Sequence, residues 1–285
     1  MKAQLIDGKR ISAEIKAEAA EEAAALKAKG ITPCLAVVLV GDDSASQVYV
    51  NNKKKACEAV GIRSVSHVLS GETTEEALLE LIAKLNADKD IHGILVQMPV
   101  PKQIDERKVI LAIDPKKDVD CFHPVNVGNL HTGGEGFLPC TPAGIIELIK
   151  RSGHSIEGKQ CVVIGRSNIV GKPVAMLLMQ ENGTVTICHS KTRNLAEICR
   201  GADIIVSAVG KVNTVTADMV KEGVILIDVG MNRNEAGKLC GDVDFENVKE
   251  IAGAITPVPG GVGPMTIAML MKNCNIAAKI QNGLE

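Results

Sequence analysis

Short apolar runs alternate with longer amphipathic segments along most of the chain. The apolar runs are rich in Val, Ile and Leu and end at glycine or a polar residue, a pattern typical of strands buried in a parallel sheet. They lie at residues 34–40, 94–96, 161–164, 202–210 and 224–230. Helix-period patterns separate them at residues 12–30, 44–60, 73–87 and 195–201, and a final one covers 266–281. This alternation predicts an α/β protein with right-handed crossovers.

The chain has 285 residues, enough for about two domains. We place the boundary after the glycine-rich stretch 133–136, where PCTPAG begins a new helix with Thr141 as a suitable N-cap. We therefore expect an N-terminal α/β domain over residues 1–138. A second, Rossmann-like domain with a parallel sheet is expected over 139–265. The C-terminal helix, 266–285, is expected to pack back on the first domain.

The segment QCVVIGRSNIVGKP, residues 160–173, has the order strand, glycine turn, helix. This arrangement directs backbone N–H groups and a helix N-terminus at a phosphate. It departs from the G-x-G-x-x-G pattern, because Ser167 replaces the second glycine and Gly171 comes late. Since two-glycine turns of this kind are common in α/β proteins, the turn alone leaves a dinucleotide site and an ordinary loop equally open.

The next strand favours a dinucleotide site and indicates which dinucleotide it binds. An NAD site carries an acidic residue about twenty residues after the turn, for the ribose 2′-hydroxyl. Here the strand ends in His189, Ser190, Lys191, Thr192 and Arg193, with no acid among them, and Arg166 lies in the turn itself. Hydroxyl donors and cations suit a 2′-phosphate, so NADP is the expected cofactor.

Composition excludes several other classes of function. The formal net charge is −2 with no dominant basic patch, which argues against nucleic acid or an anionic membrane as a partner. No run of about eighteen apolar residues occurs, and the N-terminus lacks a signal-peptide core, so a soluble cytoplasmic protein is expected. The nine cysteines are scattered without a C-x-x-C pair, which indicates reduced, buried thiols, and no metal site is expected.

A helix in the first half carries a candidate acid/base. Tyr49, the only tyrosine, and Lys53 are four residues apart and share a helix face, while Lys54 and Lys55 turn to other faces. A lysine amine in a poorly hydrated cleft has a lowered pKa and can exchange a proton near neutral pH. Most KKK runs are solvated charged faces, and the local sequence does not separate this interpretation from a Lys53 that points inward.

Two further polar residues follow the first-domain strands. Gln97 ends the strand 94–96, where open α/β sheets place ligand groups, and its amide can bind an amine. Asp120, in a loop beside Phe122, can accept two N–H bonds from a heterocycle. Each residue is also compatible with an ordinary polar strand end or loop position.

Seven motifs in order give a specific resemblance over nearly the whole chain. They are ASQVYVNNKKKACEAVGI, GILVQMPVP, DVDCFHPVNVG, PCTPAG, GRSNIVGKPVA, CHSKT and TPVPGGVGPMT. On these motifs the sequence resembles the bifunctional methylenetetrahydrofolate dehydrogenase/methenyltetrahydrofolate cyclohydrolase family. The residues by themselves predict an NADP-binding enzyme of two domains with a candidate Lys–Gln–Asp cleft, and no substrate.

The resemblance implies roles for particular residues. It implies that Lys53 is catalytic, that Tyr49 lines the pterin pocket and orders that lysine, that Gln97 hydrogen-bonds it, and that Asp120 grips the pterin. Cofactor contacts are implied for Gly165, Arg166, Ser167, Ser190, Thr192 and Thr141, with Arg166 and Ser190 on the 2′-phosphate. Pro264 is implied to lie beside the substrate. Cys121 departs from the pattern, because glycine is expected there, and this puts the shape of the pterin pocket in doubt.

The implied chemistry has two steps in the cleft between the domains. NADP⁺ oxidises 5,10-methylenetetrahydrofolate to the methenyl cation, and water then opens the ring to give 10-formyltetrahydrofolate. The resemblance further implies a cytoplasmic homodimer that serves one-carbon metabolism and purine biosynthesis. The alternatives are a monofunctional dehydrogenase, an NADP-binding regulator without turnover, and a shikimate-type hydroxy-acid dehydrogenase.

Overall fold

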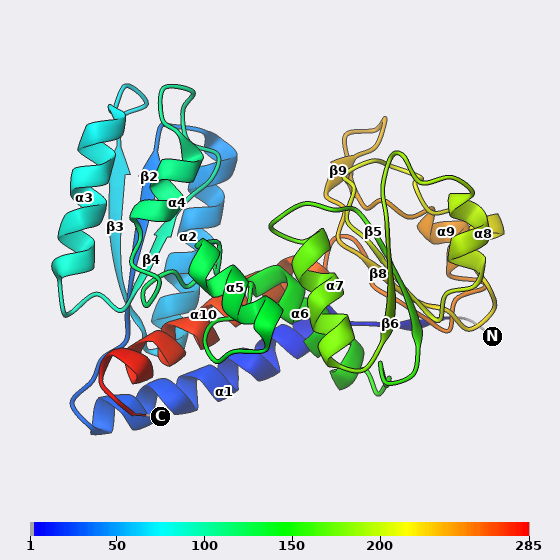
Figure 1. Cartoon of the computed structure of the whole chain (residues 1–285), viewed down its shortest axis with the longest axis horizontal. Helices are drawn as coiled ribbons and strands as arrows, with labels where there is room; N and C mark the ends of the chain where they lie inside the picture. The colour runs from blue at the N-terminus through cyan, green and yellow to red at the C-terminus, as the bar shows by residue number, and fades with distance from the viewer. Residues whose placement is uncertain (1–2, 285) are drawn as a thin grey trace. The chain divides into compact units, whose positions relative to one another are not determined.

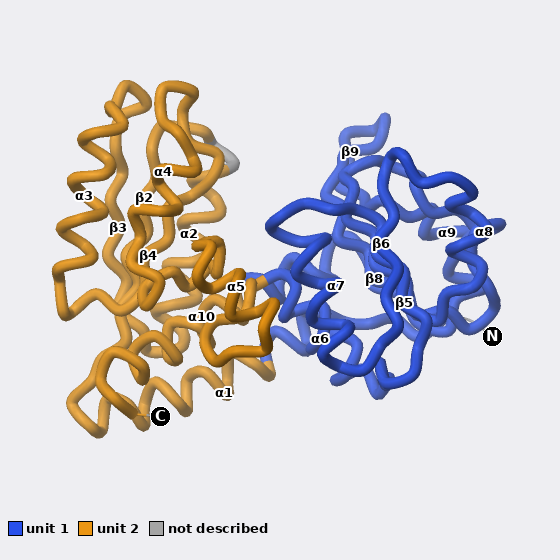
Figure 2. The backbone as a smooth tube through the Cα atoms, viewed as in Figure 1, with its two compact units in different colours: residues 1–13, 141–266 blue, residues 14–140, 267–285 orange. Residues whose placement is uncertain are grey.

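The computed structural model describes residues 3–284 and divides the chain into two compact units, shown in Figure 2. Unit 1 contains residues 1–13 and 141–266, and unit 2 contains residues 14–140 and 267–285. Each unit has its own parallel sheet, with helices between successive strands. The predicted fold class, two α/β domains of which one carries a Rossmann-like parallel sheet, is confirmed.

Unit 2 is built on a sheet of three parallel strands in the order β3-β2-β4 (Figure 1). The strands are β2 (Cys34–Val40), β3 (Arg63–Leu69) and β4 (Gly93–Val96). All seven residues of β2 are buried, as the continuous apolar run predicts for a central strand. The helices of the chain that contribute to this unit are α1 (Gly8–Ala28), α2 (Ser44–Val60), α3 (Glu75–Ala87), α4 (Glu106–Ala112), α5 (Pro124–Thr132) and α10 (Val262–Gln281).

The C-terminal part of α10 is tied to unit 2 by side-chain amides. Asn273 donates through Nδ2 to the carbonyl oxygens of Val119 and Leu138, both at 2.8 Å. Asn275 donates to the carbonyl oxygen of Ala19 at 2.8 Å. Both asparagines are buried, and amide donors in a core require such partners. These bonds fix α10 against segments that are far away in the sequence.

Unit 1 contains a sheet of six parallel strands in the order β1-β11-β8-β7-β5-β6. The strands are β1 (Gln4–Leu5), β5 (Gln160–Ile164), β6 (Thr184–Cys188), β7 (Ile204–Ser207), β8 (Ile225–Asp228) and β11 (Ala254–Ile255). The other elements are α6 (Cys140–Arg151), α7 (Gly171–Gln180), α8 (Leu195–Arg200), a 3₁₀ turn (Ala217–Met219), α9 (Phe245–Val248) and the β9–β10 hairpin (Asn232–Arg233 and Leu239–Cys240).

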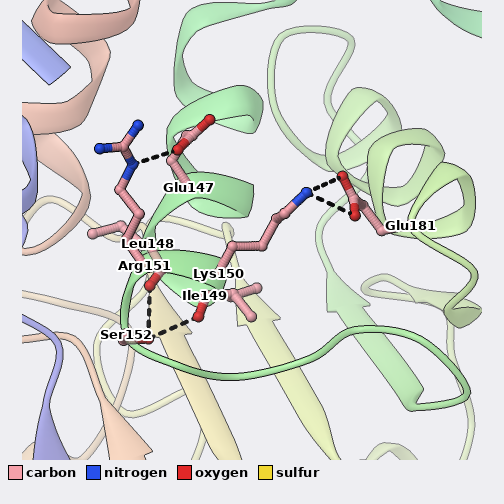
Figure 3. A network of polar contacts seen from close by, with 7 residues as sticks. All are labelled: Glu147, Leu148, Ile149, Lys150, Arg151, Ser152 and Glu181. Atoms are coloured by element: carbon pink, nitrogen blue, oxygen red, sulfur yellow. Dashed lines mark hydrogen bonds and ion pairs between the residues drawn. The ribbon is translucent and has the colours of Figure 1, made fainter. Parts of the chain in front are cut away.

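Polar contacts close the C-terminal end of α6, as Figure 3 shows. Lys150 bridges to both carboxylate oxygens of Glu181, just beyond α7, at 2.9 and 3.0 Å. Arg151 pairs with Glu147 one turn earlier, and the Ser152 hydroxyl donates to the carbonyls of Leu148 and Ile149. The hydroxyl satisfies free carbonyls at the helix C-terminus, and the two cations complement the helix dipole there.

The structure differs from the sequence-based boundaries in three places. Residues 1–13 were assigned to the first domain, but β1 extends the sheet of unit 1, with Gln4 opposite Ala254 and Leu5 opposite Ile255. A two-residue strand has too few positions to show a period. Helix α6 begins at Cys140, so Thr141 lies in its first turn rather than at the N-cap. Helix α10 begins at Val262, four residues before the start predicted at residue 266.

Candidate active site

The helix α2 presents Lys53 toward the interior of unit 2. It starts after Asp43, whose carboxylate accepts the N–H of Ser46 at 2.8 Å, and it stops at Gly61, whose φ of 77° suits glycine. On this helix Lys53 is half-buried, while its neighbours Lys54 and Lys55 are exposed. The 3.6-residue period separates one inward lysine from a charged run that otherwise faces water. Tyr49, one turn earlier, is 40% exposed.

Gln97 meets this lysine from the end of β4. Its backbone N–H donates to the Val38 carbonyl at 2.8 Å, which continues the β2–β4 ladder by one residue. Its Oε1 accepts from Lys53 Nζ at 2.8 Å, and its Nε2 donates to the carbonyl of Met98 at 2.8 Å. Because both ends of the amide are engaged, its oxygen is held toward the amine.

Asp120 lies close enough to Lys53 for the two charges to interact. Burial raises the pKa of the Asp120 carboxyl to about 6, the Lys53 charge opposes that rise, and the neighbouring Asp118 adds to it. The structure therefore brings Lys53, Gln97 and Asp120 together around one amine. A carboxyl with such a pKa changes its charge close to physiological pH, as acid/base and binding groups in enzymes often do.

Asp118, which no sequence pattern singled out, shapes the loop around Asp120. This buried carboxylate accepts the N–H groups of Phe122 at 3.2 Å and His123 at 2.8 Å, and the Asn126 amide at 2.8 Å. Three donors around one acidic residue fix the turn on which Asp120 stands. No local pattern distinguishes the two aspartates of DVD, because their roles depend on which of them the fold buries.

Two thiols border Asp120. Cys140 Sγ lies 3.9 Å from Asp120 Oδ1 and 3.5 Å from the Val119 carbonyl, and burial raises the pKa of this thiol well above its ordinary value. Cys121, expected to be glycine, has a φ of 61°, the left-handed region that glycine favours. Its Sγ donates to the Phe137 carbonyl at 3.3 Å. The side chain is thus buried and bonded, and the backbone keeps the conformation that a glycine would adopt.

The turn after β5 is a tight cradle of two glycines. A Cβ on Gly165, whose φ is 124°, would lie 2.4 Å from the Ala208 carbonyl oxygen. A Cβ on Gly171 would lie 2.3 Å from the Gly165 carbonyl oxygen. Ser167 Oγ accepts the N–H groups of Val170 at 3.2 Å and Gly171 at 3.3 Å, where α7 begins. The late Gly171 therefore supplies the close helix–strand approach that the third glycine of a dinucleotide fingerprint supplies.

Polar and cationic side chains follow β6, the strand next to β5. Thr192 Oγ1 accepts the His189 N–H at 2.8 Å and closes the turn. Arg166 and Ser190 are exposed at the carboxyl ends of these adjacent strands. The residues 189–193 contain no carboxylate, so the described site offers cations and hydroxyls where an NAD site places an acid.

Thr141 and Pro264 also belong to unit 1. Thr141 Oγ1 and Thr266 Oγ1 are hydrogen-bonded at 2.8 Å, which joins the N-terminal parts of α6 and α10. The Pro264 carbonyl accepts from Ser12 Oγ at 3.0 Å. Gly8, at the start of α1, packs against the same PGGVGP segment, because a Cβ there would lie 1.8 Å from the Gly261 oxygen. The N-terminal residues thus support this segment, a contact that no sequence pattern predicts.

Comparison with protein families accounts for both groups of residues. Residues 6–120 match the catalytic domain of tetrahydrofolate dehydrogenase/cyclohydrolase, and residues 139–282 match its NAD(P)-binding domain. The chain belongs to the tetrahydrofolate dehydrogenase/cyclohydrolase family. It is 62% identical to the bifunctional protein FolD of Agathobacter rectalis over 277 residues, covering 97% of this chain and 99% of the relative. The FolD of Acetivibrio thermocellus is 60% identical over 281 residues, 99% of each chain.

Solved structures of this family have the same fold. The FolD crystal structure from Campylobacter jejuni superposes with a TM-score of 0.95 at 53% identity, covering 98% of this chain and 99% of that one. The enzyme of Trypanosoma brucei, described as complexed with NADP and an inhibitor, gives 0.92 at 41% identity, with 98% of each chain covered. The predicted family and its two activities are confirmed. A shikimate dehydrogenase from Aquifex aeolicus, at 15% identity and a TM-score of 0.52, shares the fold alone.

No helix within residues 3–284 is long and apolar enough to cross a bilayer. Folate as the substrate follows from the family.

Proposed function

We propose that this enzyme oxidises 5,10-methylenetetrahydrofolate with NADP⁺ and then hydrolyses the methenyl product to 10-formyltetrahydrofolate, with Lys53 as the acid/base. The observation that carries this proposal is the 2.8 Å contact between Lys53 Nζ and Gln97 Oε1, beside the half-buried Asp120. The amine is held by a neutral acceptor rather than neutralised by a direct salt bridge. Such an amine keeps its lone pair available whenever it gives up its proton.

The hydrolysis needs a group that takes a proton and returns it. Water adds to the methenyl carbon while neutral Lys53 accepts a proton from it, which forms the new C–O bond. The lysine then returns that proton to N5 as the C–N5 bond breaks, and the hydroxyl proton leaves for solvent as the formyl C=O forms. Gln97 holds the amine in place through both transfers, because its other end is fixed on Met98.

Asp120 binds the pterin ring in this proposal. Its ionised carboxylate accepts two N–H bonds from the aminopyrimidinone edge, a planar, charge-assisted pairing. Tyr49, one turn from Lys53 and 40% exposed, offers a ring face for the flat substrate. Cys140, protonated because its pKa is raised, donates toward Asp120 and leaves that carboxylate's charge intact.

The cofactor groups lie in unit 1, where the glycine cradle fits a pyrophosphate. Because neither Gly165 nor Gly171 carries a Cβ, the backbone of this turn can come close to the phosphates. When bound, NADP⁺ supplies the hydride acceptor of the first step. Arg166 and Ser190 hold the 2′-phosphate, and Ser167 and Thr192 shape the loops that carry them. Thr141 and Pro264 complete the set through the N-terminal parts of α6 and α10.

One incubation tests the function as a whole. Purified protein is mixed with methylenetetrahydrofolate and either NADP⁺ or NAD⁺, and reduced dinucleotide and the methenyl chromophore are followed together. The proposal expects dinucleotide reduction with NADP⁺ preferred, followed by decay of the methenyl absorbance faster than in buffer. Reduction with a persistent methenyl signal would instead identify a monofunctional dehydrogenase. Absence of reduction with both dinucleotides would identify a binding protein without turnover.

The finer properties rest on the family resemblance. We expect a homodimer that works in the cytoplasm and supplies one-carbon units for purine biosynthesis. Light scattering on the purified chain distinguishes a dimer from a monomer of 30.0 kDa.

A further inference from the structure

The sheet of unit 1 reverses its winding direction at β5. Strand β6 lies on one side of β5 and β7 on the other, and ligands of open α/β sheets bind at the carboxyl ends of the strands at such a reversal. The segment after β7 occupies this position. The Ala208 N–H donates to the Ile164 carbonyl at 2.8 Å, and the Ala208 oxygen approaches Gly165 so closely that no Cβ fits. Residues 208–212 therefore adjoin the dinucleotide turn.

The carboxylate of Asp242 accepts hydrogen bonds from this segment and so fixes its conformation. The carboxylate is fully buried, and its Oδ2 accepts from Ser207 Oγ at 3.1 Å, Val209 N at 2.8 Å and Gly210 N at 3.2 Å. Its Oδ1 accepts from Lys211 N at 2.9 Å and Asn232 Nδ2 at 2.9 Å. Three consecutive backbone N–H groups thus converge on one anion, as they do in the backbone nests that bind phosphates.

A second buried carboxylate fixes Asp242 itself. Asp228, at the end of β8, accepts the N–H groups of Gly230 and Asp242 at 2.9 Å and of Val243 at 3.0 Å. The close approach of the two carboxylates to the backbone requires glycine at positions 230 and 241. A Cβ on Gly230 would lie 2.2 Å from Asp242 Oδ1, and one on Gly241 would lie 1.8 Å from Asp228 Oδ2. The position of the Asp242 carboxylate is therefore determined by the sheet.

With the backbone donors turned inward to Asp242, apolar side chains of the segment face outward. Val209 is 46% exposed and Val212 is 37% exposed, at the edge of the sheet where a flat ligand is expected. An apolar surface beside a glycine cradle suits the ring of a dinucleotide. If the carboxylate were absent, three neighbouring N–H groups would need new partners, and the segment would leave this conformation.

We propose that Asp242 is a positioning residue for the nicotinamide dinucleotide, because it fixes residues 209–211 as the surface on which the cofactor rests. This inference rests on the proposed use of NADP. Since the segment lies on the β7 side of β5, opposite the β6 side that carries Ser190 and the cations, Asp242 serves NADPH and NADH equally.

The test compares Asp242→Asn with Asp203→Asn in the full chain. The amide introduced by Asp242→Asn can replace only one carboxylate oxygen, so it turns an N–H₂ toward either the Lys211 or the Val209 donor. Asp203 is a matched control on the same sheet, because it accepts from Gln160 N and pairs with Lys221 at the amino ends of β5 and β7. NADPH and NADH affinities are measured by fluorescence titration, and methenyl hydrolysis is measured without dinucleotide.

The expected result for Asp242→Asn is a rise of at least about ten-fold in both dissociation constants, with the KM for NADP⁺ raised and the KM for folate unchanged. Methenyl hydrolysis stays within about two-fold, because Lys53, Gln97 and Asp120 belong to unit 2. The Asp203→Asn variant should bind both dinucleotides as the wild type does. Unchanged dinucleotide affinity in Asp242→Asn would overturn the inference.

If Asp242→Asn loses both dinucleotide binding and hydrolysis, the variant has lost its fold. The milder variant Asn232→Ala then tests the inference. This variant removes one donor and leaves the carboxylate, and it should weaken both dinucleotides about three-fold with hydrolysis retained. Wild-type affinity in that variant would overturn the inference. Wild-type protein that binds neither dinucleotide would refute the proposed cofactor, which is a different failure.

Discussion

The ammonium nitrogen of Lys53 donates to Oε1 of Gln97 over 2.8 Å, and the amide nitrogen of Gln97 is in turn fixed on the Met98 carbonyl. The lysine is therefore placed by a group that does not titrate. A carboxylate in the place of Gln97 would hold the amine in its charged form. The Gln97 amide therefore positions the amine of Lys53 without adding a negative charge beside it.

Replacing Lys53 with Met should abolish methenyl hydrolysis, because no other amine contacts Gln97 among the described contacts. A loss of at least about 100-fold is expected, the usual contribution of a positioned acid/base. Lys54→Met, on the exposed face of the same helix, is the control and should retain wild-type activity. Decay of the methenyl chromophore measures both variants. Full hydrolysis by Lys53→Met would disprove the assignment.

Folate binding should weaken in acid because of Asp120. Its pKa is raised from 3.8 to about 6, mainly by burial, so the carboxylate becomes protonated below that pH and loses an acceptor. The KM for methylenetetrahydrofolate should be flat above pH about 6 and rise below it, by about ten-fold per pH unit. Asp120→Asn should show a high KM without this pH dependence, while Glu80→Gln, exposed on α3, should keep the wild-type profile.

The raised pKa of Asp120 also affects the stability of the fold. Whereas it weakens folate binding at low pH, it lowers the free energy of unfolding at high pH. The folded protein holds the Asp120 proton more tightly than the unfolded chain does. Below pH about 4 the carboxyl is protonated in both states, so its ionisation does not reduce the free energy of unfolding. Between pH about 4 and 6 the unfolded chain ionises first, so the free energy of unfolding falls. Above pH about 6 this loss of stability stays constant. Asp120→Asn should therefore gain stability relative to the wild type as the pH rises through this window, and chemical unfolding at several pH values measures the gain. A constant difference between the two proteins would contradict the raised pKa.

Arg166→Ala should weaken NADP⁺ far more than NAD⁺. The exposed guanidinium stands at the carboxyl end of β5 beside the strand that carries Ser190, and only NADP⁺ has a 2′-phosphate for it to bind. A loss of about 10–100-fold in kcat/KM for NADP⁺ is expected, with NAD⁺ changed by less than about three-fold. Arg200→Ala, an exposed arginine of the same unit, is the control. Equal losses for both dinucleotides would reject the 2′-phosphate contact.

Gly171→Ala should destabilise unit 1 and impair its dinucleotide site together. The new Cβ would lie 2.3 Å from the Gly165 carbonyl oxygen and 2.8 Å from the Arg166 backbone nitrogen, and these backbone atoms cannot move aside as a flexible side chain could. Overpacking of this kind costs about 1–3 kcal/mol. Gly201→Ala is the matched control, because its Cβ would lie 3.5 Å from the nearest atom. Thermal unfolding and NADPH titration measure both variants, and a wild-type melting temperature for Gly171→Ala would contradict the close approach.

Replacing Cys121 with glycine should preserve activity, whereas replacing it with valine should reduce both stability and folate binding. Its φ of 61° favours glycine, and a β-branched side chain there is costly. Cys121→Gly should keep both activities within about three-fold, while Cys121→Val should lose about 1–2 kcal/mol of stability and raise the KM for folate. Steady-state kinetics and chemical unfolding check the pair. A fully active, stable valine variant would show that the loop adopts another conformation.

Much of the architecture could be predicted from the sequence, because local pattern determines it. The apolar runs at 34–40 and 161–164 correspond to β2 and β5, and the strand–turn–helix order around Gly165 is present as expected. Helical phase separated Lys53 from Lys54 and Lys55, although only the structure shows that Lys53 is the partly buried one. For the strands and the turn, the deciding information lies within one or two turns of chain.

The rest could not be predicted because it depends on contacts between distant segments. Asp118 and Asp242 look like ordinary loop aspartates, yet each is buried under converging N–H groups supplied by the fold. Gly8 becomes essential only because Gly261 packs against it. The sequence indicates only that Cys140 is a buried, reduced thiol, and the structure alone places its sulfur beside Asp120.

Strand β1 has a consequence for how the chain folds during synthesis. Its partner β11 lies about 250 residues later, so this edge of the six-stranded sheet stays incomplete until residues 254–255 have left the ribosome. The family match that begins at residue 139 therefore does not mark an autonomous fragment. A gene fragment that starts there would expose the edge of β11, and exposed edges of this kind promote association with other chains.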